Sequence, residues 1–436
     1  MYQVKAYDIE IFPNYALFVF IDIEPYMEMY RRIHDPKTKK LLVSESEKIR
    51  LIKEIPRVHF EISSVEGYEK NDLLALLDYC NQWDYLVGFN ILDYDNIILN
   101  MLAMDLYKFE SIKDINTRLF KLSSKIVNTD RDLLKNDAVH KLYKFYGSRY
   151  YSIDLQKIPA LDKVFKGLKQ TLINLKWFKI EEHSLPDLTV DELKYYDLPP
   201  LLTLQQASKY INHWHRFLTK EHIPSVIYYC ENDVLGCCEL FCFLEEQISL
   251  RFNLKAQYDI DVLSASDSKI ADIFIAKYYS EYTGIPYKEY KDLRTHRTRM
   301  NIGKIISPLI KFKSKEFNDL LVSLMSKTVS STNEINYPVT FNGVTYDIKS
   351  GGLHSRDNPK IYVFPDGSYY IEDGDVGSYY PTLTKNMKVA PKHLDQEAFI
   401  EVTVIMMNER LEAKAAGDTV KANSLKITIN VGMFGK

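Results

Sequence analysis

The sequence has little of what marks a secreted or membrane protein. It contains five cysteines in 436 residues, and no two of them form a Cys-x-x-Cys pair. An odd cysteine count without that spacing argues against a disulfide framework and for a reducing compartment. No apolar run is long enough to span a bilayer, and the first residues lack the basic and then apolar pattern of a signal peptide. We therefore expect no membrane partner and a cytoplasmic protein, located in the host cytoplasm if the gene is viral.

Charge and composition exclude few further classes. The net charge is only −3 at pH 7, so bulk charge gives no separate argument for a nucleic-acid partner. Glycine and proline are scarce, with 16 of each, and no internal repeat is visible. A hydrophobic content of 46% with 26% charged residues is ordinary for a globular protein, and the length suffices for two or three domains. The function must therefore be inferred from motifs.

Four acidic residues stand out because each lies inside a short motif although they are far apart in the chain. Asp8 and Glu10 lie in YDIEIF, Asp95 lies in GFNILDYD, and Asp233 lies in YYCEND. On a strand, residues i and i+2 share a face, which places the first two carboxylates side by side. On a helix, residues i and i+4 share a face, which places Tyr229 beside Asp233. Four carboxylates this close need compensation, and two divalent cations would supply it while clamping the oxygens of a phosphodiester.

These motifs, read in chain order, resemble a known family. The sequence D-I-E, the pattern N-x-x-x-Y-D from Asn90 to Asp95, and the pattern Y-x-x-x-D from Tyr229 to Asp233 are similar to the proofreading 3′-5′ exonuclease of phage-like family B DNA polymerases. Downstream, DVGSYYP at 375–381 resembles the palm motif of that family, and KITINVGMFG at 426–435 resembles its fingers motif. The resemblance implies an α/β fold in which an RNase H-like DEDDy exonuclease domain with a mixed sheet precedes a partial palm and short two-helix fingers.

The resemblance also implies roles in the exonuclease site. Asp8, Glu10, Asp95 and Asp233 would hold two Mg²⁺ ions, with Mn²⁺ as an alternative. Tyr229 would orient the attacking water. Two further residues would contact the single-stranded primer end, Asn90 through its amide and Phe89 by stacking on a base.

A second group of residues belongs to the polymerase half of the resemblance. Asp375 would be a palm carboxylate with the Val376 carbonyl as an additional metal ligand, and Tyr380 would be the steric gate that favours deoxynucleotides. The family's Y-x-G-G element reads here as KSGG, which implies DNA contacts from Lys349, Gly351 and Gly352. The residues that would converge on the triphosphate of a dNTP from two helices are Arg410, Lys414, Lys426 and Asn430.

Hydrophobic patterns divide the chain into three expected domains. They are an exonuclease domain at 1–255, a linker and partial palm at 256–392, and fingers helices at 393–436. Within the first domain we expect a strand hairpin at 2–24, a helix at 72–80, a buried strand at 85–90, a helix from residue 93, a strand at 150–155 and a long helix at 225–250. The long helix carries four cysteines, which we interpret as packing residues rather than zinc ligands. The segments 105–148 and 183–224 are insertions without an evident role.

The second palm motif of the family, Y-x-D-T-D, does not occur in the sequence. We therefore expect no polymerisation by this chain alone, and interpret it as the N-terminal portion of a family B DNA polymerase. A truncation, an interrupted gene or a split enzyme would account for this, and in a split enzyme a second chain would supply Y-x-D-T-D and the thumb. Its substrates would be single-stranded and primer-template DNA, with dNTPs once completed. Two alternatives remain, a stand-alone DEDDy exonuclease and a non-catalytic DNA-binding or assembly subunit of a split polymerase.

Overall fold

A computed structural model gives the fold of the chain. It describes residues 3–145, 151–158, 167–180, 185, 193, 196, 215–286, 288–289, 293, 297–330, 334–349, 352–356, 367, 372 and 378–433. Within these residues the chain forms two compact units, one comprising Met1–Ile275 and Glu409–Lys436 and the other Ala276–Asn408. Each unit is described by itself.

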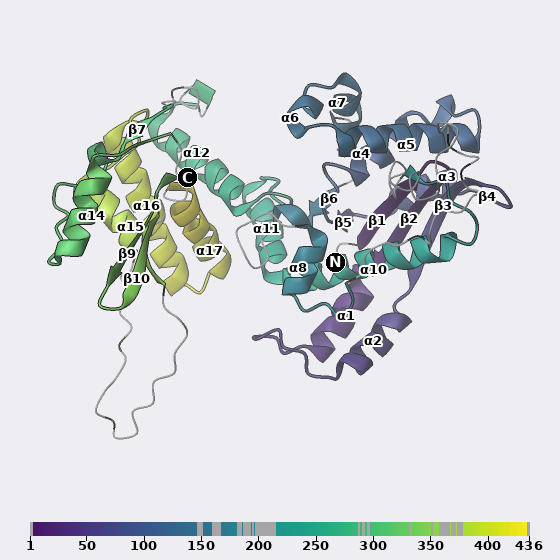
Figure 1. The fold of residues 1–436 in the computed structure, drawn as a ribbon, viewed down its shortest axis with the longest axis horizontal. Coiled ribbons are helices and arrows are strands. Elements are labelled where there is room, and N and C mark those ends of the chain that lie inside the picture. Colours follow the sequence, from purple (N-terminus) through teal and green to yellow (C-terminus); the bar gives the residue numbers. More distant parts are fainter. Residues whose placement is uncertain are drawn as a thin grey trace. The chain divides into compact units, whose positions relative to one another are not determined.

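The first unit is an α/β structure built on a six-stranded mixed sheet with the strand order β4-β3-β2-β1-β5-β6 (Figure 1). β1 lies in the interior of the sheet, antiparallel to β2 and parallel to β5, which is itself parallel to β6. The expected hairpin, buried strand and later strand are all present. The strands are β1 Val4–Phe12, β2 Tyr15–Asp22, β3 Arg57–Val65, β4 Tyr68–Asn71, β5 Tyr85–Gly88 and β6 Ser152–Asp154.

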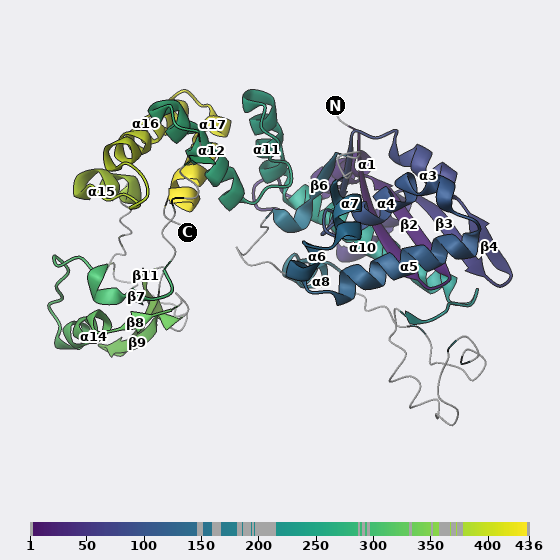
Figure 2. The same ribbon diagram turned by 90° about the horizontal axis from the view of Figure 1, so that it is seen from above.

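Helices cover both faces of the sheet, which explains why β2 is apolar and buried along almost its whole length. One face packs against α1 Ile23–Ile33, α2 Glu45–Glu54, α8 Leu168–Asn174 and α10 Ile223–Phe243. The other packs against α3 Leu73–Cys80, α4 Asp95–Met104, α5 Ile112–Asn128 and α7 Ala138–Phe145, with α6 Arg131–Leu134 between the last two in the chain. Figures 1 and 2 show α1 and α5 on opposite sides of the strands.

The prediction of one long helix at 225–250 is wrong in one respect, because the structure has two helices there. α10 ends at Phe243, and α11 runs from Glu245 to Tyr258 after a single residue, Leu244. The two glutamates at the start of α11 favour a new helix N-terminus, where negative charge is stabilised by the helix dipole. The cysteines of α10 are free and buried, as expected for packing residues. Burial raises the pKa of the Cys237, Cys238 and Cys242 thiols, which disfavours the thiolate that zinc needs.

The second unit contains two small sheets and several helices. β7 Met300–Asn301 pairs with β8 Thr328–Val329, and a three-stranded antiparallel sheet has the order β11-β10-β9. A small core forms around Ile302, Leu324 and Val329. The remaining elements are β9 Asn336–Phe341, β10 Val344–Lys349, β11 Gly352–Arg356, α14 Lys315–Met325 and α15 Tyr379–Met387.

The division between the two units falls inside two helices, α12 Asp267–Thr283 and α16 Gln396–Ala415. α16 is followed by α17 Thr419–Ile427, so the expected helix pair is confirmed. Gly417 has a φ of 77° between them, and the Asp418 side chain caps α17 by accepting a hydrogen bond from the Lys421 amide. A π-helical segment, Thr428–Met433, follows. The three expected domains stay a prediction. No helix among the described residues is both long and apolar enough to cross a membrane.

Candidate metal centre

Asp8 and Glu10 lie on the interior strand β1, two residues apart. Tyr7, Ile9 and Ile11, which alternate with them, belong to the core beneath α3, α4 and α5. Because strand side chains alternate between faces, Asp8 and Glu10 point to the opposite face, which α10 covers. Glu10 is buried and Asp8 is half-buried. The expected pairing of the two carboxylates on one face is therefore found in the structure.

α10 brings Tyr229, Cys230 and Asp233 to this face of β1. The Cys230 thiol lies 3.8 Å from a carboxylate oxygen of Asp8 and 3.7 Å from its backbone oxygen. One ligand atom from each of Asp8, Glu10 and Cys230 lies within 4.8 Å of the other two. From its position on the long helix, Cys230 was predicted only to be a packing residue. Its position three residues before Asp233, on the same helix face, was the signal that it would reach the acids.

Asp95 reaches the acids through the loop that follows β5. β5 runs parallel to β1, so its carboxyl end lies beside the middle of β1, at the edge where ligand sites form in such sheets. Gly88 ends β5 so close to β1 that a β-carbon there would lie 2.7 Å from the Tyr7 carbonyl oxygen. Only glycine allows this approach. Asp95 then begins α4 and is 3% exposed.

Asp154 on β6 holds this loop in place. Its carboxylate accepts hydrogen bonds from the backbone amides of Asn90, at 2.8 Å, and Leu92, at 3.4 Å. Asn90 has a φ of 66°, a left-handed conformation that asparagine tolerates better than most residues. Asp154 is therefore a positioning residue that sequence reasoning missed, since only the pairing of β5 with β6 brings it to the loop.

The four acids perturb one another strongly. Burial, together with the charge of Asp233, raises the pKa of Asp8 to about 8. Burial and then the charges of Asp8, Asp233 and Asp95 raise the pKa of Glu10 well above its ordinary value. Burial and then the charge of Asp8 do the same for Asp95. Among the described residues, the ligand atoms that lie within 4.8 Å of one another belong to Asp8, Glu10 and Cys230, and this group does not include Asp95 or Asp233. Asp95 and Asp233 act on it through their charges, which raise the pKa of Glu10.

Tyr229 and a lysine complete the cluster. Tyr229 is buried, and burial followed by the charge of Asp233 raises the pKa of its phenol, which also hydrogen-bonds to Asp233. Lys169 on α8 places its ammonium 5.0 Å from the Tyr229 ring centre, and its charge lowers the pKa of Glu10. α8 can approach α10 because Gly236 has no side chain, since a β-carbon there would lie 2.6 Å from Leu172. Sequence reasoning missed Lys169 because no motif marks it.

Two oxygens at this site lack partners. Oδ1 of Asp95 and Oδ1 of Asn90 are buried and accept no hydrogen bond within the described residues. An unsatisfied buried acceptor costs about 1–3 kcal/mol. Oxygen atoms of this kind, among mutually repelling carboxylates, match the ligands that Mg²⁺ and Mn²⁺ prefer, whereas the donor set has only one sulfur for a softer metal. The residues present therefore fit the divalent cations that the resemblance implies.

The expected DNA-binding residue Phe89 is half-buried and packs against the core on the α10 face. Stacking on a base therefore stays a prediction for the exposed part of its ring.

Some of the predicted polymerase residues lie outside the described residues, namely Asp375, Val376 and Gly351. Tyr380 is on α15 and is 49% exposed. Lys349 and Gly352 face each other across the β10–β11 pair. Lys414, Lys426 and Asn430 are exposed and Arg410 is half-buried. Their predicted roles stay predictions.

No protein-family model, curated protein or solved structure matches this chain. Its function therefore has to be inferred from the residues and their geometry.

Proposed function

We propose that the first unit is an RNase H-like, metal-dependent 3′-5′ DNA exonuclease of the DEDDy type, the proofreading part of a phage-like family B DNA polymerase. One observation carries the proposal. Ligand atoms of Asp8 and Glu10 lie within 4.8 Å of each other on β1, and the charges of Asp95 and Asp233, from two distant segments of the chain, raise the pKa of Glu10. The order of the motifs, and the position of two of the acids on an interior strand of a mixed sheet, give further support.

In this proposal Asp8, Glu10, Asp95 and Asp233 would hold two Mg²⁺ ions, and the side-chain oxygen of Asn90 would contact the end of a DNA strand. The bound ions supply the charge that lowers the pKa of the attacking water and stabilises the departing 3′ oxygen. Tyr229 keeps its proton, because its pKa is raised, so its hydroxyl can exchange a hydrogen bond with that water. Lys169 contributes a positive charge beside Glu10, where the phosphate of the strand would approach.

We propose polymerisation only for a completed enzyme. Nucleotide addition uses two metal ions and needs a second palm carboxylate besides Asp375. Primer-template DNA and dNTPs would then be its substrates, with Tyr380 and the cations of α16 and α17 near the nucleotide, and the cytoplasm would be its compartment. The two alternatives, a stand-alone nuclease and a non-catalytic subunit, differ from this proposal in the activities that they allow.

The test is cleavage of a 5′-labelled single-stranded oligonucleotide with Mg²⁺. We expect Asp8→Ala with Glu10→Ala to lower the rate at least about 100-fold, as expected for the loss of groups that bind the ions. The matched control is Glu28→Ala with Glu69→Ala, which removes two exposed acids from the same unit and should leave the rate unchanged.

The polarity of cleavage comes from end protection. A phosphorothioate at the 3′ end should block degradation, and one at the 5′ end should not. Cleavage by the Asp8, Glu10 double variant at the wild-type rate would refute the assignment of the site. A folded wild-type protein without nuclease activity would instead favour the non-catalytic subunit.

A further inference from the structure

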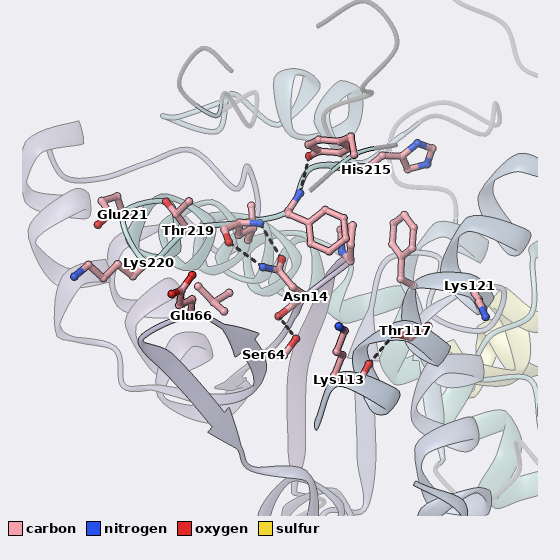
Figure 3. A pocket seen from close by; sticks show the side chains of 16 residues that line it. Asn14, Ser64, Glu66, Lys113, Thr117, Lys121, His215, Thr219, Lys220 and Glu221 are labelled. Carbon is pink, nitrogen blue, oxygen red and sulfur yellow. Dashed lines mark hydrogen bonds between the residues drawn. The ribbon is translucent and has the colours of Figure 1, made fainter. Parts of the chain in front are cut away.

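The first unit contains a cavity of about 850 Å³ that is separate from the acid cluster (Figure 3). It lies at the tip of the β1–β2 hairpin, against Pro13 and Asn14. One main wall comes from α5 in the segment 105–148, and the other from the described residues 196, 215 and 217–221 of the segment 183–224. Both insertions therefore contribute to one feature of the molecule.

One wall is a single face of α5. Lys113, Thr117, Phe120 and Lys121 line the cavity, and their spacing places them on the same side of the helix. Figure 3 shows Lys113 and Thr117 together on this wall, with Lys121 farther along the helix. The α5 wall thus combines an aromatic ring with two ammonium groups.

The opposite wall is aromatic and is fixed to the hairpin. The side-chain amide of Asn14 donates to the Leu218 carbonyl at 2.9 Å, and the Leu218 amide donates to the Asn14 side-chain oxygen at 2.8 Å. The Phe217 amide donates to the Tyr196 hydroxyl at 2.8 Å. The His215 ring meets Phe120 edge to face, with 5.5 Å between ring centres. Hydrogen bonds therefore tie this wall to the same hairpin that carries Asp8 and Glu10.

The charges of the cavity favour an anionic ligand at the α5 side. Lys113 and Lys121 are exposed, and within the described ranges neither forms an ion pair. Two glutamates, Glu66 and Glu221, also line the cavity. A hydrogen bond from Thr219, together with a smaller contribution from the charge of Lys220, lowers the pKa of the Glu221 carboxyl. Lys113, Lys121 and Lys220 give the lining three positive charges against the two of the glutamates, so the net charge of the lining is +1, and Asp114 on α5 also interacts with the charge of Lys121.

Unpaired ammonium groups next to aromatic rings are the features with which proteins bind single-stranded nucleic acid. The rings stack on bases, at about 1–3 kcal/mol per base, and the lysines contact phosphates. The volume lies within the range of about 300–1,000 Å³ that is common for ligand sites. Glu10 lies two residues, or about 7 Å along β1, before Phe12, where the hairpin turn of Pro13 and Asn14 begins. Because Asp8 and Glu10 face α10 whereas α5 packs on the other face of the sheet, a strand of a few nucleotides would pass around the hairpin tip from the acid cluster to the cavity.

We propose that this cavity binds the single strand on the 5′ side of the nucleotide that is removed. The inference rests on the proposed exonuclease function, because it places the 3′ end of the same strand at the acid cluster. It predicts that long and short substrates differ in their dependence on α5. A strand too short to reach the cavity gains nothing from Lys113, Phe120 or Lys121.

The experiment measures binding of fluorescent (dT)3 and (dT)12 to the whole chain by anisotropy, with Ca²⁺ in place of Mg²⁺, and cleavage of both with Mg²⁺. The variants are Lys113→Ala with Lys121→Ala, and Phe120→Leu. The matched control is Lys37→Ala with Lys53→Ala, which removes two exposed lysines that do not line the cavity.

We expect each cavity variant to weaken (dT)12 binding about tenfold or more and the lysine variant to reduce the salt dependence of binding, with (dT)3 unchanged. Unchanged cleavage of (dT)3 also shows that the variants are folded. Equal affinity of wild type and variants for (dT)12 would overturn the inference alone. The inference alone would also be overturned if the variants weaken the binding of free dTMP but not the binding of (dT)12. A wild-type protein that neither binds nor cleaves any oligonucleotide would overturn the proposed function as well.

Discussion

Neutralising two acids of the cluster should stabilise the metal-free protein. Asp8→Asn with Glu10→Gln keeps the shapes of the side chains and removes two of the charges that repel each other. Each native carboxylate is held at the centre of the sheet without a cation, and burial and neighbouring acids raise the pKa of both. The folded state therefore pays for their ionisation, and the amides remove that cost.

The magnitude follows from Asp8. Its pKa rises from 3.8 in the unfolded chain to about 8 in the folded protein. At pH 7 the folded protein therefore loses the free energy that corresponds to the roughly three pH units between 3.8 and 7. One unit corresponds to about 1.4 kcal/mol, which gives about 4 kcal/mol as an upper limit. Asp8 is half-buried, so solvent reduces the figure to about 1–3 kcal/mol. In a unit of this size that corresponds to a rise in Tm of about 2–6 °C.

The pH dependence has a definite sign. Because the pKa of Asp8 is raised on folding, the unfolded chain releases its proton first, and stability falls as pH increases from about 4 to about 8. The double variant should lack most of this decline. Below pH 4 both proteins carry a neutral group at this position, so their melting temperatures should converge.

The assay is thermal unfolding in EDTA and in Mg²⁺ between pH 4 and pH 8. Mg²⁺ at 100 times its Kd should increase the free energy of unfolding of the wild type by about 2.7 kcal/mol and so raise its Tm. The Tm of the variant should not change. A variant that melts below the wild type in EDTA at pH 7 would refute the reasoning, since it would mean that these carboxylates stabilise the fold. Equal stabilisation of both proteins by Mg²⁺ would place the cation elsewhere.

Two further predictions concern the loop that carries Asp95. Burial would raise the pKa of Asp93, but hydrogen bonds from Lys144 and Lys157 lower it to about 2. Asp93→Asn should therefore lower the free energy of unfolding by about 1 kcal/mol at neutral pH and leave it unchanged below pH 2. Urea unfolding at pH 7 and pH 2 checks this, and an equal loss at both would contradict it. Gly88→Ala should destabilise by about 2–3 kcal/mol because its β-carbon would meet the Tyr7 carbonyl, and an unchanged Tm would show that the strand end can move.

The fold of the first unit was largely predictable where the pattern is local. Alternation around Pro13 and Asn14 gave the hairpin, and the apolar run at 85–90 gave β5. The break at Leu244 was not predictable, because apolar residues continue through it with helical spacing and only the two glutamates that follow mark a new helix. Local periodicity reports which residues face the core, and it does not report where a helix changes direction.

The candidate site divides in the same way. The acids were identifiable because spacings of two on a strand and four on a helix set their faces before any tertiary contact forms. Lys169 and Asp154 were not, since each reaches the site through packing between elements, α8 against α10 at Gly236 and β6 beside β5. The cavity at the hairpin tip depends even more on tertiary contacts, because Asn14 must bind Leu218, about two hundred residues later, before its walls face each other. Residues that bind a substrate by position rather than by reactivity leave no motif, so a segment that looks like an insertion is where such residues should be sought.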